Sequence, residues 1–492
     1  MKKIGFMRGC GVIMSVSSLP SKYGIGSFGR SAYDFVDFLA ESGQRYWQVL
    51  PLNPTAYGDS PYQSPASVAG NPYFIDLDLL QSEGLLTKGE LLGHRMTGDR
   101  VDYGRLFGER YAILRIAYSR FSGSREYNKF VRENQSWLDD YALFMALKVK
   151  NGYVSFVEWC ESERDYKKAV LKKCDYESEM SFWKFLQFEF FSQWKLLKAY
   201  AKKKKITVIG DLPIYVAHDS MDVWRSPEEF CLNEDYNPKE VAGCPPDAFS
   251  EDGQLWGNPI YNWDYMKSQG FSWWCERIER ALELYDIVRI DHFRGFAGYY
   301  SIPYGESTAR CGRWNSAPGK ELFSKILEAV PGAKIIAEDL GYITDDVREL
   351  LSFTGFAGMK MLHFAFDCEE SEYLPRKYVT DNTVVYASSH DSECTASWVK
   401  SLSAEVKSRF DRECPRVKGQ SRTYDLILLA HLSRANLSMV LMQDYLGLTS
   451  DEGRMNTPSK SEGNWAWRIS PRYRTSALKR KMLALAKRGK RA

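Results

Sequence analysis

The sequence has almost no net charge, little histidine and no long apolar run. Its 66 basic and 63 acidic residues leave a net charge of only +3 over 492 residues, so no overall field attracts nucleic acid. No stretch approaches the ~18 consecutive apolar residues that a membrane-spanning helix needs. Only six residues are histidine. We therefore expect neither a nucleic acid nor a membrane as a partner, whereas an uncharged substrate is compatible with this composition.

The ten cysteines also lack a paired spacing. They are scattered from Cys10 to Cys414 without any C-x-x-C pair, and a chain this long and apolar needs no disulfides to hold its core. We expect mostly free, buried thiols and a reducing, cytoplasmic location. The fairly apolar start of the chain, up to Pro20, could be a signal peptide, but Arg8 interrupts it. Because residues 9–16 make a good first strand, we prefer a structural role for this segment.

What the chain does contain is eight short apolar or β-branched runs. They lie at 11–16, 46–50, 206–209, 287–290, 334–337, 359–364, 383–387 and 438–442. Helical patterns at 31–41, 181–203, 273–284, 320–330, 344–352 and 424–433 fill most of the intervals. Strands that alternate with helices form parallel βαβ units. The sequence therefore predicts an α/β protein, a (β/α)8 TIM barrel.

One interval is too long for an ordinary connection. About 155 residues separate the second and third runs, which predicts a large, mostly helical insertion between strands 2 and 3. We divide the chain into the first part of a catalytic barrel (1–57), an inserted helical subdomain (58–185) and the remainder of the barrel (186–492). The last part holds a further loop insertion at about 217–265 and a C-terminal helix. We interpret the lysine run 202–205 as the exposed end of a helix rather than as a binding patch.

Three carboxylates follow three of the predicted strands. In a (β/α)8 barrel the strands end on one face, so acids far apart in sequence can meet at one point there. Two carboxyl groups on either side of one bond are what glycoside cleavage requires. The three motifs are Arg289-Ile-Asp291-His292, Ala337-Glu338-Asp339 and Ser389-His390-Asp391.

Asp291 and Glu338 are the predicted pair that breaks and forms bonds. Arg289 lies two residues before Asp291 and hence on the same face of its strand, where its guanidinium can keep a nucleophilic aspartate ionised. The alternative is a purely structural ion pair. Glu338 is the candidate general acid and base, which needs a raised pKa. The alternative for Glu338 and Asp339 is that they cap a helix.

A second set of residues is predicted to bind the sugar. Asp391, preceded by His390, would hold hydroxyl groups and stabilise the charged transition state, or else cap a helix that starts near Glu393. Asp211 would support the site from the end of the third strand. Phe249, Trp256 and Tyr62 offer aromatic faces for sugar rings. The alternative for the aromatic residues is a packed loop without a ligand.

Two further patterns are weaker. The segment Gly24-Ile-Gly26-Ser-Phe-Gly29 matches a dinucleotide-binding motif literally, but no strand runs into its first glycine and no acid follows the next strand, as such a site requires. The pairs His218-Asp219 and His390-Asp391, with the reversed pair Asp291-His292, could be ligands in a metal phosphohydrolase. We do not prefer this reading, because histidines are few and these pairs follow different strands.

Taken together, these residues resemble the 4-alpha-glucanotransferases called amylomaltase or disproportionating enzyme, glycoside hydrolase family 77. The resemblance covers nearly the whole chain, and the order and number of its motifs make coincidence negligible. The motifs are Arg8-Gly-Cys-Gly-Val, Ser18-Leu-Pro, Tyr23-Gly-Ile-Gly, Asp59-Ser-Pro-Tyr-Gln, Gly70-Asn-Pro-Tyr, Gly210-Asp-Leu-Pro-Ile-Tyr-Val-Ala, Pro245-Pro-Asp-Ala-Phe, Trp256-Gly-Asn-Pro, Arg289-Ile-Asp-His-Phe-Arg-Gly-Phe, Ala337-Glu-Asp-Leu-Gly, Arg454-Met-Asn and Asn464-Trp-Ala-Trp-Arg.

The resemblance implies a retaining transfer of an α-1,4-glucan segment to the 4-hydroxyl of glucose or a maltodextrin. It implies Asp291 as nucleophile, Glu338 as acid/base and Asp391 as stabiliser, with Asp211, Arg289 and His390 supporting the donor sugar. Maltodextrins and glycogen or starch fragments would be the partners, and no partner protein is indicated. We expect no metal and no cofactor, because exchanging one α-1,4 bond for another is nearly thermoneutral.

Two stretches depart from the family pattern. They are Ser388-Ser389-His390-Asp391-Ser392 and Asn456-Thr-Pro-Ser459-Lys, and neither changes a carboxylate. Two rival functions remain. An α-glucan hydrolase would use the same carboxylates with water as acceptor, and the second rival, a catalytically idle glycan-binding protein, would not need all three acids.

Overall fold

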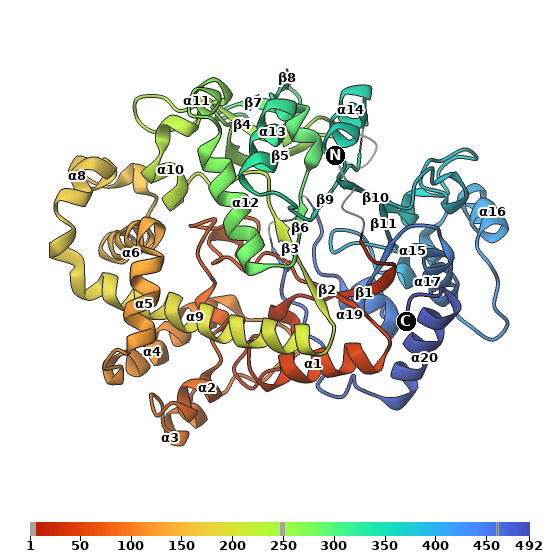
Figure 1. Ribbon diagram of the computed structural model, residues 1–492, viewed down its shortest axis with the longest axis horizontal. Coiled ribbons are helices and arrows are strands. Elements are labelled where there is room, and N and C mark those ends of the chain that lie inside the picture. The colour runs from red at the N-terminus through yellow and green to blue at the C-terminus, as the bar shows by residue number, and fades with distance from the viewer. Residues whose placement is uncertain (1–5, 247–250, 342, 459, 461) are drawn as a thin grey trace.

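Eight parallel strands close into a barrel at the centre of the molecule (Figure 1). The computed structural model describes residues 6–246, 251–341, 343–458, 460 and 462–492. Around the barrel the strands follow the order β1, β12, β11, β10, β9, β6, β3, β2. Each predicted strand overlaps one of them, so the predicted (β/α)8 barrel is confirmed. The barrel strands are β1 (Gly9–Ile13), β2 (Tyr46–Gln48), β3 (Thr207–Leu212), β6 (Ile287–Ile290), β9 (Ile335–Ala337), β10 (Ala357–Met361), β11 (Thr383–Tyr386) and β12 (Leu437–Leu441).

Helices surround this barrel in the intervals where the sequence predicts them. Six predicted helical patterns correspond to α1 (Arg30–Glu41), α9 (Glu177–Lys203), α12 (Ser272–Leu284), α13 (Gly319–Ala329), α14 (Asp345–Thr354) and α17 (Arg422–Leu432). The C-terminal helix is α20 (Ser476–Arg488). The other helices that follow β3 in the chain are α10 (Met221–Arg225), α11 (Trp263–Ser268), α15 (Thr395–Ser401), α16 (Ala404–Glu413), α18 (Met442–Leu446) and α19 (Ser450–Gly453).

The barrel strands are apolar on both faces because each face packs against a core. On β6, Ile287 belongs to the cluster inside the barrel and Val288 to the cluster between strands and helices. Since side chains alternate along a strand, Arg289 points toward the barrel interior. On β3, Ile209 lies in the interior cluster, and Asp211 follows it by two residues. The period of two thus brings one cation and one acid to the same end of the barrel.

The long interval between β2 and β3 is helical. Figure 1 shows most of these helices, coloured orange to yellow, at one side of the barrel. α9 is one continuous helix that passes through residue 185, and the division of the chain at 58 and 185 stays a prediction. Besides α9, the helices of this interval are α2 (Leu77–Ser82), α3 (Lys88–Gly93), α4 (Tyr103–Arg120), α5 (Arg125–Glu133), α6 (Gln135–Lys150), α7 (Glu161–Arg164) and α8 (Tyr166–Leu171).

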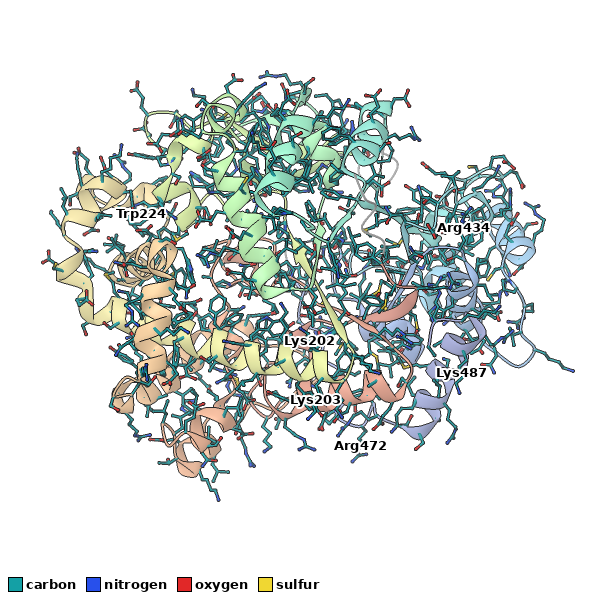
Figure 2. All side chains as sticks on the ribbon, viewed as in Figure 1. Lys202, Lys203, Trp224, Arg434, Arg472 and Lys487 are labelled. Atoms are coloured by element: carbon teal, nitrogen blue, oxygen red, sulfur yellow. The ribbon has the colours of Figure 1, made fainter. Side chains whose placement is uncertain are left out.

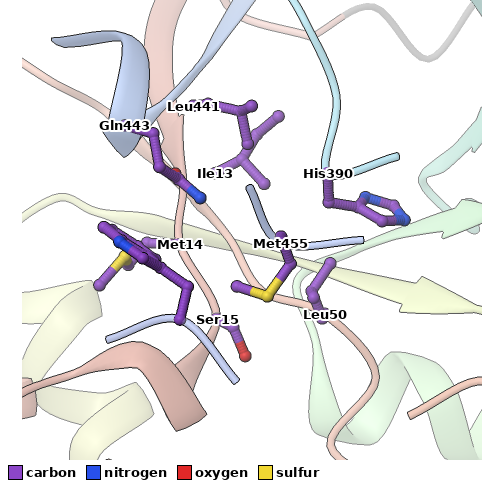
Figure 3. A pocket seen from close by; sticks show the side chains of 9 residues that line it. Ile13, Met14, Ser15, Leu50, His390, Leu441, Gln443 and Met455 are labelled. Atoms are coloured by element: carbon purple, nitrogen blue, oxygen red, sulfur yellow. The ribbon is translucent and has the colours of Figure 1, made fainter. Parts of the chain in front are cut away.

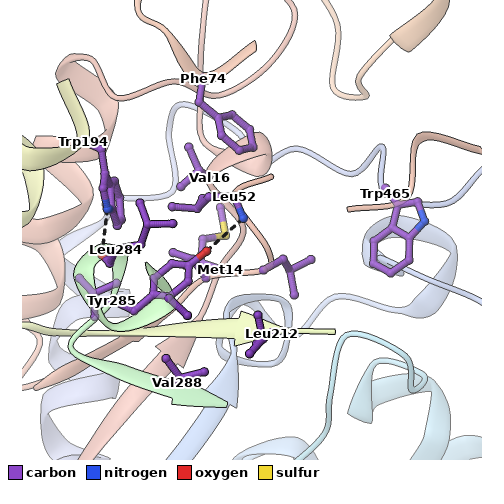
Figure 4. Packing of buried hydrophobic residues seen from close by; sticks show 14 of the residues in the cluster. Met14, Val16, Leu52, Phe74, Trp194, Leu212, Leu284, Tyr285, Val288 and Trp465 are labelled. Atoms are coloured by element: carbon purple, nitrogen blue, oxygen red, sulfur yellow. Dashed lines mark hydrogen bonds between the residues drawn. The ribbon is translucent and has the colours of Figure 1, made fainter. Parts of the chain in front are cut away.

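The helix α9 connects this interval to the barrel wall. The indole Nε1 of Trp194 donates a hydrogen bond to the Leu284 carbonyl at 2.9 Å, and the Leu52 amide donates to the Tyr285 hydroxyl at 3.2 Å (Figure 4). Both acceptors lie just before β6. These buried contacts hold the start of the strand that carries Arg289.

The structure contains a second, four-stranded sheet, which the sequence analysis missed. Its strands come from the segments that follow β3 and β6 in the chain. Its strands follow the antiparallel order β5, β4, β7, β8. They carry glycine, proline and polar residues instead of continuous apolar runs, and they come from two segments on either side of β6. The strands are β4 (Glu240–Cys244), β5 (Gln254–Pro259), β7 (Gly298–Pro303) and β8 (Arg313–Ser316).

The cysteines form no disulfide in the part of the chain that the structure describes, as predicted, but the expectation that most are buried is wrong. Only Cys10, Cys394 and Cys414 are buried among the ten. Four are exposed, at positions 160, 174, 311 and 368. All four lie in loops or short helical turns outside the barrel core, where packing and not residue type decides which side chains face solvent.

The structure also bears on the expected absence of a membrane span, on the lysine run 202–205 and on the glycine motif 24–29. Within the described ranges, no helix combines the length and apolar character needed to cross a membrane. The lysines 202–205 are exposed at the end of α9, where Figure 2 labels Lys202 and Lys203. The literal glycine motif serves close packing, because a Cβ at Gly29 would lie 1.9 Å from Asp76 Oδ2 and one at Gly26 would lie 1.9 Å from the Val16 carbonyl.

Candidate active site

The predicted acids gather at the carboxyl ends of the barrel strands. Asp291 follows β6 directly and Glu338 follows β9 directly. On β9, Ile336 lies in the interior cluster, so the alternation of side chains also turns Glu338 inward. The backbone ladder continues past the strand ends, since the Glu338 amide donates to the Ile290 carbonyl at 3.0 Å. Strand pairing therefore fixes where both carboxyl groups stand.

One guanidinium contacts three carboxylates. Arg289 Nη1 lies 2.5 Å from Asp211 Oδ1 and 3.1 Å from Asp291 Oδ1, and Nη2 lies 3.5 Å from Glu338 Oε1. Arg289 and Asp211 are almost completely buried, whereas the side chains of Asp291 and Glu338 are 25% and 20% exposed. The two predicted reacting groups are thus held by one buried cation and remain open to a substrate.

The backbone after Asp291 adds a second contact to Glu338. His292 has a left-handed conformation with φ of 49°, and its amide donates a hydrogen bond to Glu338 Oε2 at 2.5 Å. A left-handed residue other than glycine is uncommon, and here it turns the amide toward the glutamate.

The electrostatics of the carboxyl pair differ from the expectation. Burial, followed by the charge of Glu338, raises the pKa of Asp291 well above its ordinary value, although Arg289 opposes the rise. Burial also raises the pKa of Glu338. Arg289 is shared among three acids, so it does not by itself keep Asp291 ionised as we predicted. The pair instead retains one proton more readily than separate carboxyl groups would.

Asp391 has the opposite electrostatics. Its Oδ2 lies 3.2 Å from His390 Nε2, and its Oδ1 accepts a hydrogen bond from Asn456 Nδ2 at 2.6 Å. Burial raises the pKa of Asp391, but the charge and hydrogen bond of His390, with the bond from Asn456, lower it overall to about 2. Asp391 is therefore a fixed negative charge at neutral pH, whereas burial favours the protonated forms of Asp291 and Glu338.

Neither predicted capping alternative is correct. Helix α15 begins at Thr395 after Cys394, and no side chain among the described residues caps it. Helix α14 begins at Asp345 after Thr344. Asp339 instead accepts a hydrogen bond from the Met359 amide at 2.6 Å, which ties the turn after β9 to β10. Burial raises the pKa of Asp339 to about 7.

Tyr62 joins the two halves of the site. Its hydroxyl donates to Asp211 Oδ2 at 2.8 Å and lies 2.8 Å from His390 Nε2, while its ring stacks on the His390 ring at 5.5 Å. Because the tyrosine proton goes to Asp211, His390 Nε2 carries the proton that it shares with Tyr62 and Asp391. His390 also lines a small pocket of about 10 Å³, whose other lining residues include Leu50 and Met455 (Figure 3).

The predicted aromatic residues have different outcomes. Trp256, on β5, places its ring edge-on to the His292 ring at 4.9 Å, next to the predicted nucleophile. Its carbonyl accepts a hydrogen bond from Gln63 at 3.2 Å, so the loop of Tyr62 and the second sheet meet here. Phe249 lies outside the described residues. Sequence reasoning assigned no role to Asn456, although this residue ends the Arg454-Met-Asn motif and begins the second departing stretch.

The serines that depart from the family pattern form a compact turn. The Ser392 hydroxyl accepts from the Ser389 amide and donates to the Ser389 carbonyl, both at 2.9 Å. The Asp391 amide donates to Ser389 Oγ at 3.3 Å. These bonds shape the backbone around Asp391. In the second departing stretch, Ser459 lies outside the described residues.

The pair His218-Asp219 of the metal alternative makes structural contacts away from the other predicted residues. Asp219 pairs with Lys148, Nζ to Oδ2 at 2.5 Å, and accepts from the Phe156 amide at 3.0 Å. Over the part of the chain that the structure describes, no group of three or more His, Cys, Asp or Glu is arranged to hold a metal ion. His218-Asp219 thus joins the β3–β6 connection to the helical interval.

Comparison with known proteins decides the family. The sequence profile of the family described as 4-alpha-glucanotransferase matches residues 14–475. The chain belongs to the 4-alpha-glucanotransferase family. A 4-alpha-glucanotransferase of Clostridium butyricum is 47% identical over 484 residues, which cover 96% of this chain and 99% of that protein. One of Thermus thermophilus is 44% identical over 487 residues, covering 94% and 95%.

Solved structures agree with this membership. The amylomaltase of Streptococcus agalactiae in complex with acarbose superposes with a TM-score of 0.95 at 40% identity, covering 99% of this chain and 100% of that one. The amylomaltase of Corynebacterium glutamicum, at 18% identity and a TM-score of 0.79, covers 99% of this chain and 75% of that one and shares the fold. The predicted activity of this transferase is confirmed, and the alternative of an α-glucan hydrolase is not supported.

Proposed function

We propose that this 4-alpha-glucanotransferase transfers α-1,4-glucan segments by a retaining double displacement, with Asp291 as nucleophile, Glu338 as acid/base and Asp391 as transition-state stabiliser. The observation that carries the proposal is the shared guanidinium of Arg289, which contacts Asp291 and Glu338 from one buried position. A pair held by one cation suits attack from one side of a glycosidic bond and protonation from the other.

In the first step the carboxylate of Asp291 attacks the anomeric carbon of the donor. The bond from that carbon to the glycosidic oxygen breaks, and Glu338 gives its proton to the departing oxygen. A proton on Glu338 leaves the Arg289–Asp291 contact at 3.1 Å intact. The retained proton of the carboxyl pair therefore supplies the acid, and the reducing-end fragment leaves as a free sugar.

In the second step the 4-hydroxyl of an acceptor glucan replaces the first fragment. Glu338, now a carboxylate, takes the hydroxyl proton while the oxygen attacks the anomeric carbon and the ester bond to Asp291 breaks. The site returns to its first protonation state, so no cofactor is consumed. One α-1,4 bond is lost and one is made.

The fixed charge of Asp391 acts in both steps. The anomeric carbon becomes positively charged in each transition state, and a carboxylate whose pKa is about 2 stays ionised beside it. Tyr62, Asp211, Arg289, His390, Trp256 and Phe249 are the proposed substrate-binding residues. Donors and acceptors are maltodextrins and glycogen or starch fragments, and the proposed location is the cytoplasm.

The first experiment is incubation with maltotriose. Transfer conserves glycosidic bonds, so we expect glucose and a ladder of longer maltodextrins while the total of reducing ends stays nearly constant. A steady rise in reducing ends without longer products would indicate hydrolysis and overturn the proposal.

The second experiment separates the three acids with an α-glucosyl fluoride, whose leaving group needs no proton. We expect Asp291→Asn to lose several orders of magnitude in kcat with either donor. Glu338→Gln should lose activity on maltotriose but still trap the sugar from the fluoride on Asp291. Asp391→Asn should be slow with both donors.

Glu189→Gln is the matched control for Glu338→Gln. Glu189 is also buried, and burial raises its pKa to about 8, but it lies on α9 outside the site. We expect wild-type kcat for this control. Full activity of Glu338→Gln on maltotriose, or equal rescue of Asp291→Asn by the fluoride, would show that the roles are assigned wrongly.

A further inference from the structure

The loop that carries His390 and Asp391 is fastened at both ends to a single carboxylate. Asp444 Oδ2 accepts hydrogen bonds from the Ser388 hydroxyl at 2.5 Å and the Thr395 hydroxyl at 2.7 Å. Asp444 Oδ1 accepts from the Thr395 amide at 2.8 Å. Ser388 precedes Asp391 by three residues and Thr395 follows it by four, so Asp444 closes the base of this loop.

Asp444 is a buried carboxylate that accepts hydrogen bonds from both ends of this loop. It lies on α18, directly after β12, and its exposed fraction is 0%. A buried carboxylate is costly unless hydrogen bonds compensate it, and the three donors all come from the two ends of the loop. Thr395, also fully buried, is 3.1 Å from His363 Nε2 on the other side. His363, which follows β10 closely in the chain, thus contacts the same end of the loop as Asp444.

The centre of the loop is held from the same stretch of chain. The side chain of Asn456 donates a hydrogen bond to Asp391 Oδ1 at 2.6 Å, and its backbone amide donates one to the His390 carbonyl at 3.1 Å. Arg454 Nη2 donates to the Asp391 carbonyl at 3.4 Å. Residues 444–456 therefore form a frame around the loop, with Asp444 at its base and Asn456 at its tip.

We propose that Asp444 is a positioning residue for the transfer reaction, which acts through the Ser388–Thr395 loop to set the place of Asp391 opposite Asp291 and Glu338. The inference rests on the proposed role of Asp391. Asp444 is buried beneath the loop, so any effect that it has on the transition state passes through the loop backbone. Misplacement of a catalytic group by about 1 Å can cost about 100-fold in rate.

The test compares Asp444→Asn with the wild-type enzyme. The amide keeps the size of the side chain but points an NH2 group at one of its donors. We expect kcat to fall about 10- to 100-fold with maltotriose and with α-glucosyl fluoride alike, because Asp391 serves both donors. The KM for maltotriose should stay within about threefold, since the substrate does not contact Asp444.

Asp76→Asn is the matched control. Asp76 is likewise buried and accepts from one hydroxyl, Ser27 at 2.6 Å, and one backbone amide, Leu79 at 3.1 Å, but it caps α2 outside the site. We expect it to leave kcat unchanged. If both variants lowered kcat to the same extent, general loss of structure would explain Asp444→Asn and the proposal would fail.

A double-mutant cycle with Asp391→Asn separates positioning from an independent effect. If Asp444 acts through Asp391, the double variant should be no slower than Asp391→Asn by more than about threefold. Additive losses would overturn the inference. An unaffected kcat in Asp391→Asn itself would instead reject the proposed function, so the two failures are distinguishable.

Weaker variants keep the test decisive if Asp444→Asn does not fold. Ser388→Ala and Thr395→Val each remove one hydroxyl bond from Asp444, and Thr395→Ser restores the second one. We expect a several-fold loss of kcat in the first two and recovery in the third. Wild-type kcat in both Ser388→Ala and Thr395→Val would count against the positioning role.

Discussion

Replacing Arg289 by lysine should move the acid limb of the pH–rate profile to higher pH. The guanidinium uses Nη1 for Asp211 and Asp291, and Nη2 for Glu338. Lysine keeps the positive charge but has a single nitrogen, so it cannot reach both edges of this cluster. At least one carboxyl group of the reacting pair then loses its cationic partner.

The size of the shift follows from the contacts. A hydrogen bond to a charged group contributes about 1.5–3 kcal/mol, and one pKa unit corresponds to about 1.4 kcal/mol. Loss of one such contact should therefore raise the pKa of the pair by about one to two units, on top of the rise that burial causes. The sign is clear, because the ionised nucleophile is the form that the cation stabilises.

The assay is kcat/KM for α-glucosyl fluoride as a function of pH. Fluoride leaves without a proton, so the acid limb reports ionisation of the nucleophile. We expect Arg289→Lys to lose rate at low pH and to recover part of it as pH rises. Arg310→Lys is the control, since Arg310 also pairs with two acids, Glu251 and Asp252, but on the surface. An acid limb that stays in place or moves to lower pH would show that Arg289 does not stabilise the ionised nucleophile.

Three further predictions concern the chemistry and geometry of the site. EDTA should leave the rate of maltotriose disproportionation within about a factor of two, and a loss that Zn²⁺ or Mn²⁺ restores would contradict a carboxylate-only mechanism. A crystal structure with a bound glucan should place the carboxyl groups of Asp291 and Glu338 about 5–5.5 Å apart, whereas about 6.5–9.5 Å would indicate inversion. Asn456→Ala should lower kcat about 10- to 100-fold, because a hydrogen bond to the charged Asp391 is lost; an unchanged kcat would mean that Asn456 is not needed.

The barrel and its acids could be predicted from local sequence because both depend on a short period. Parallel barrel strands are covered on both faces, so they appear as apolar runs. The alternation of side chains then places Arg289 and Asp291 on one face, and their contact at 3.1 Å agrees with this. The carboxyl ends of all eight strands lie on one side of any such barrel. Glu338, which follows β9, therefore lies near Asp291, which follows β6.

Other parts of the site depend on residues that only folding brings together. Asn456 is 65 residues from Asp391, and Tyr62 is 328 residues from His390. The second sheet joins segments on either side of β6, and its strands carry no apolar run that marks them. No local pattern encodes such pairs.

The raised pKa of Asp291 also had to come from the tertiary structure. The sequence alone placed Arg289 beside it and suggested an ionised aspartate. Folding put Asp211 and Glu338 on the same guanidinium and left the Asp291 side chain only 25% exposed, so burial raises its pKa. A charge in a barrel mouth responds to every group around it, whereas the sequence determines only its neighbours along one strand. Residue type and period therefore determined the fold and the identity of the acids, and packing decided their protonation and their supporting contacts.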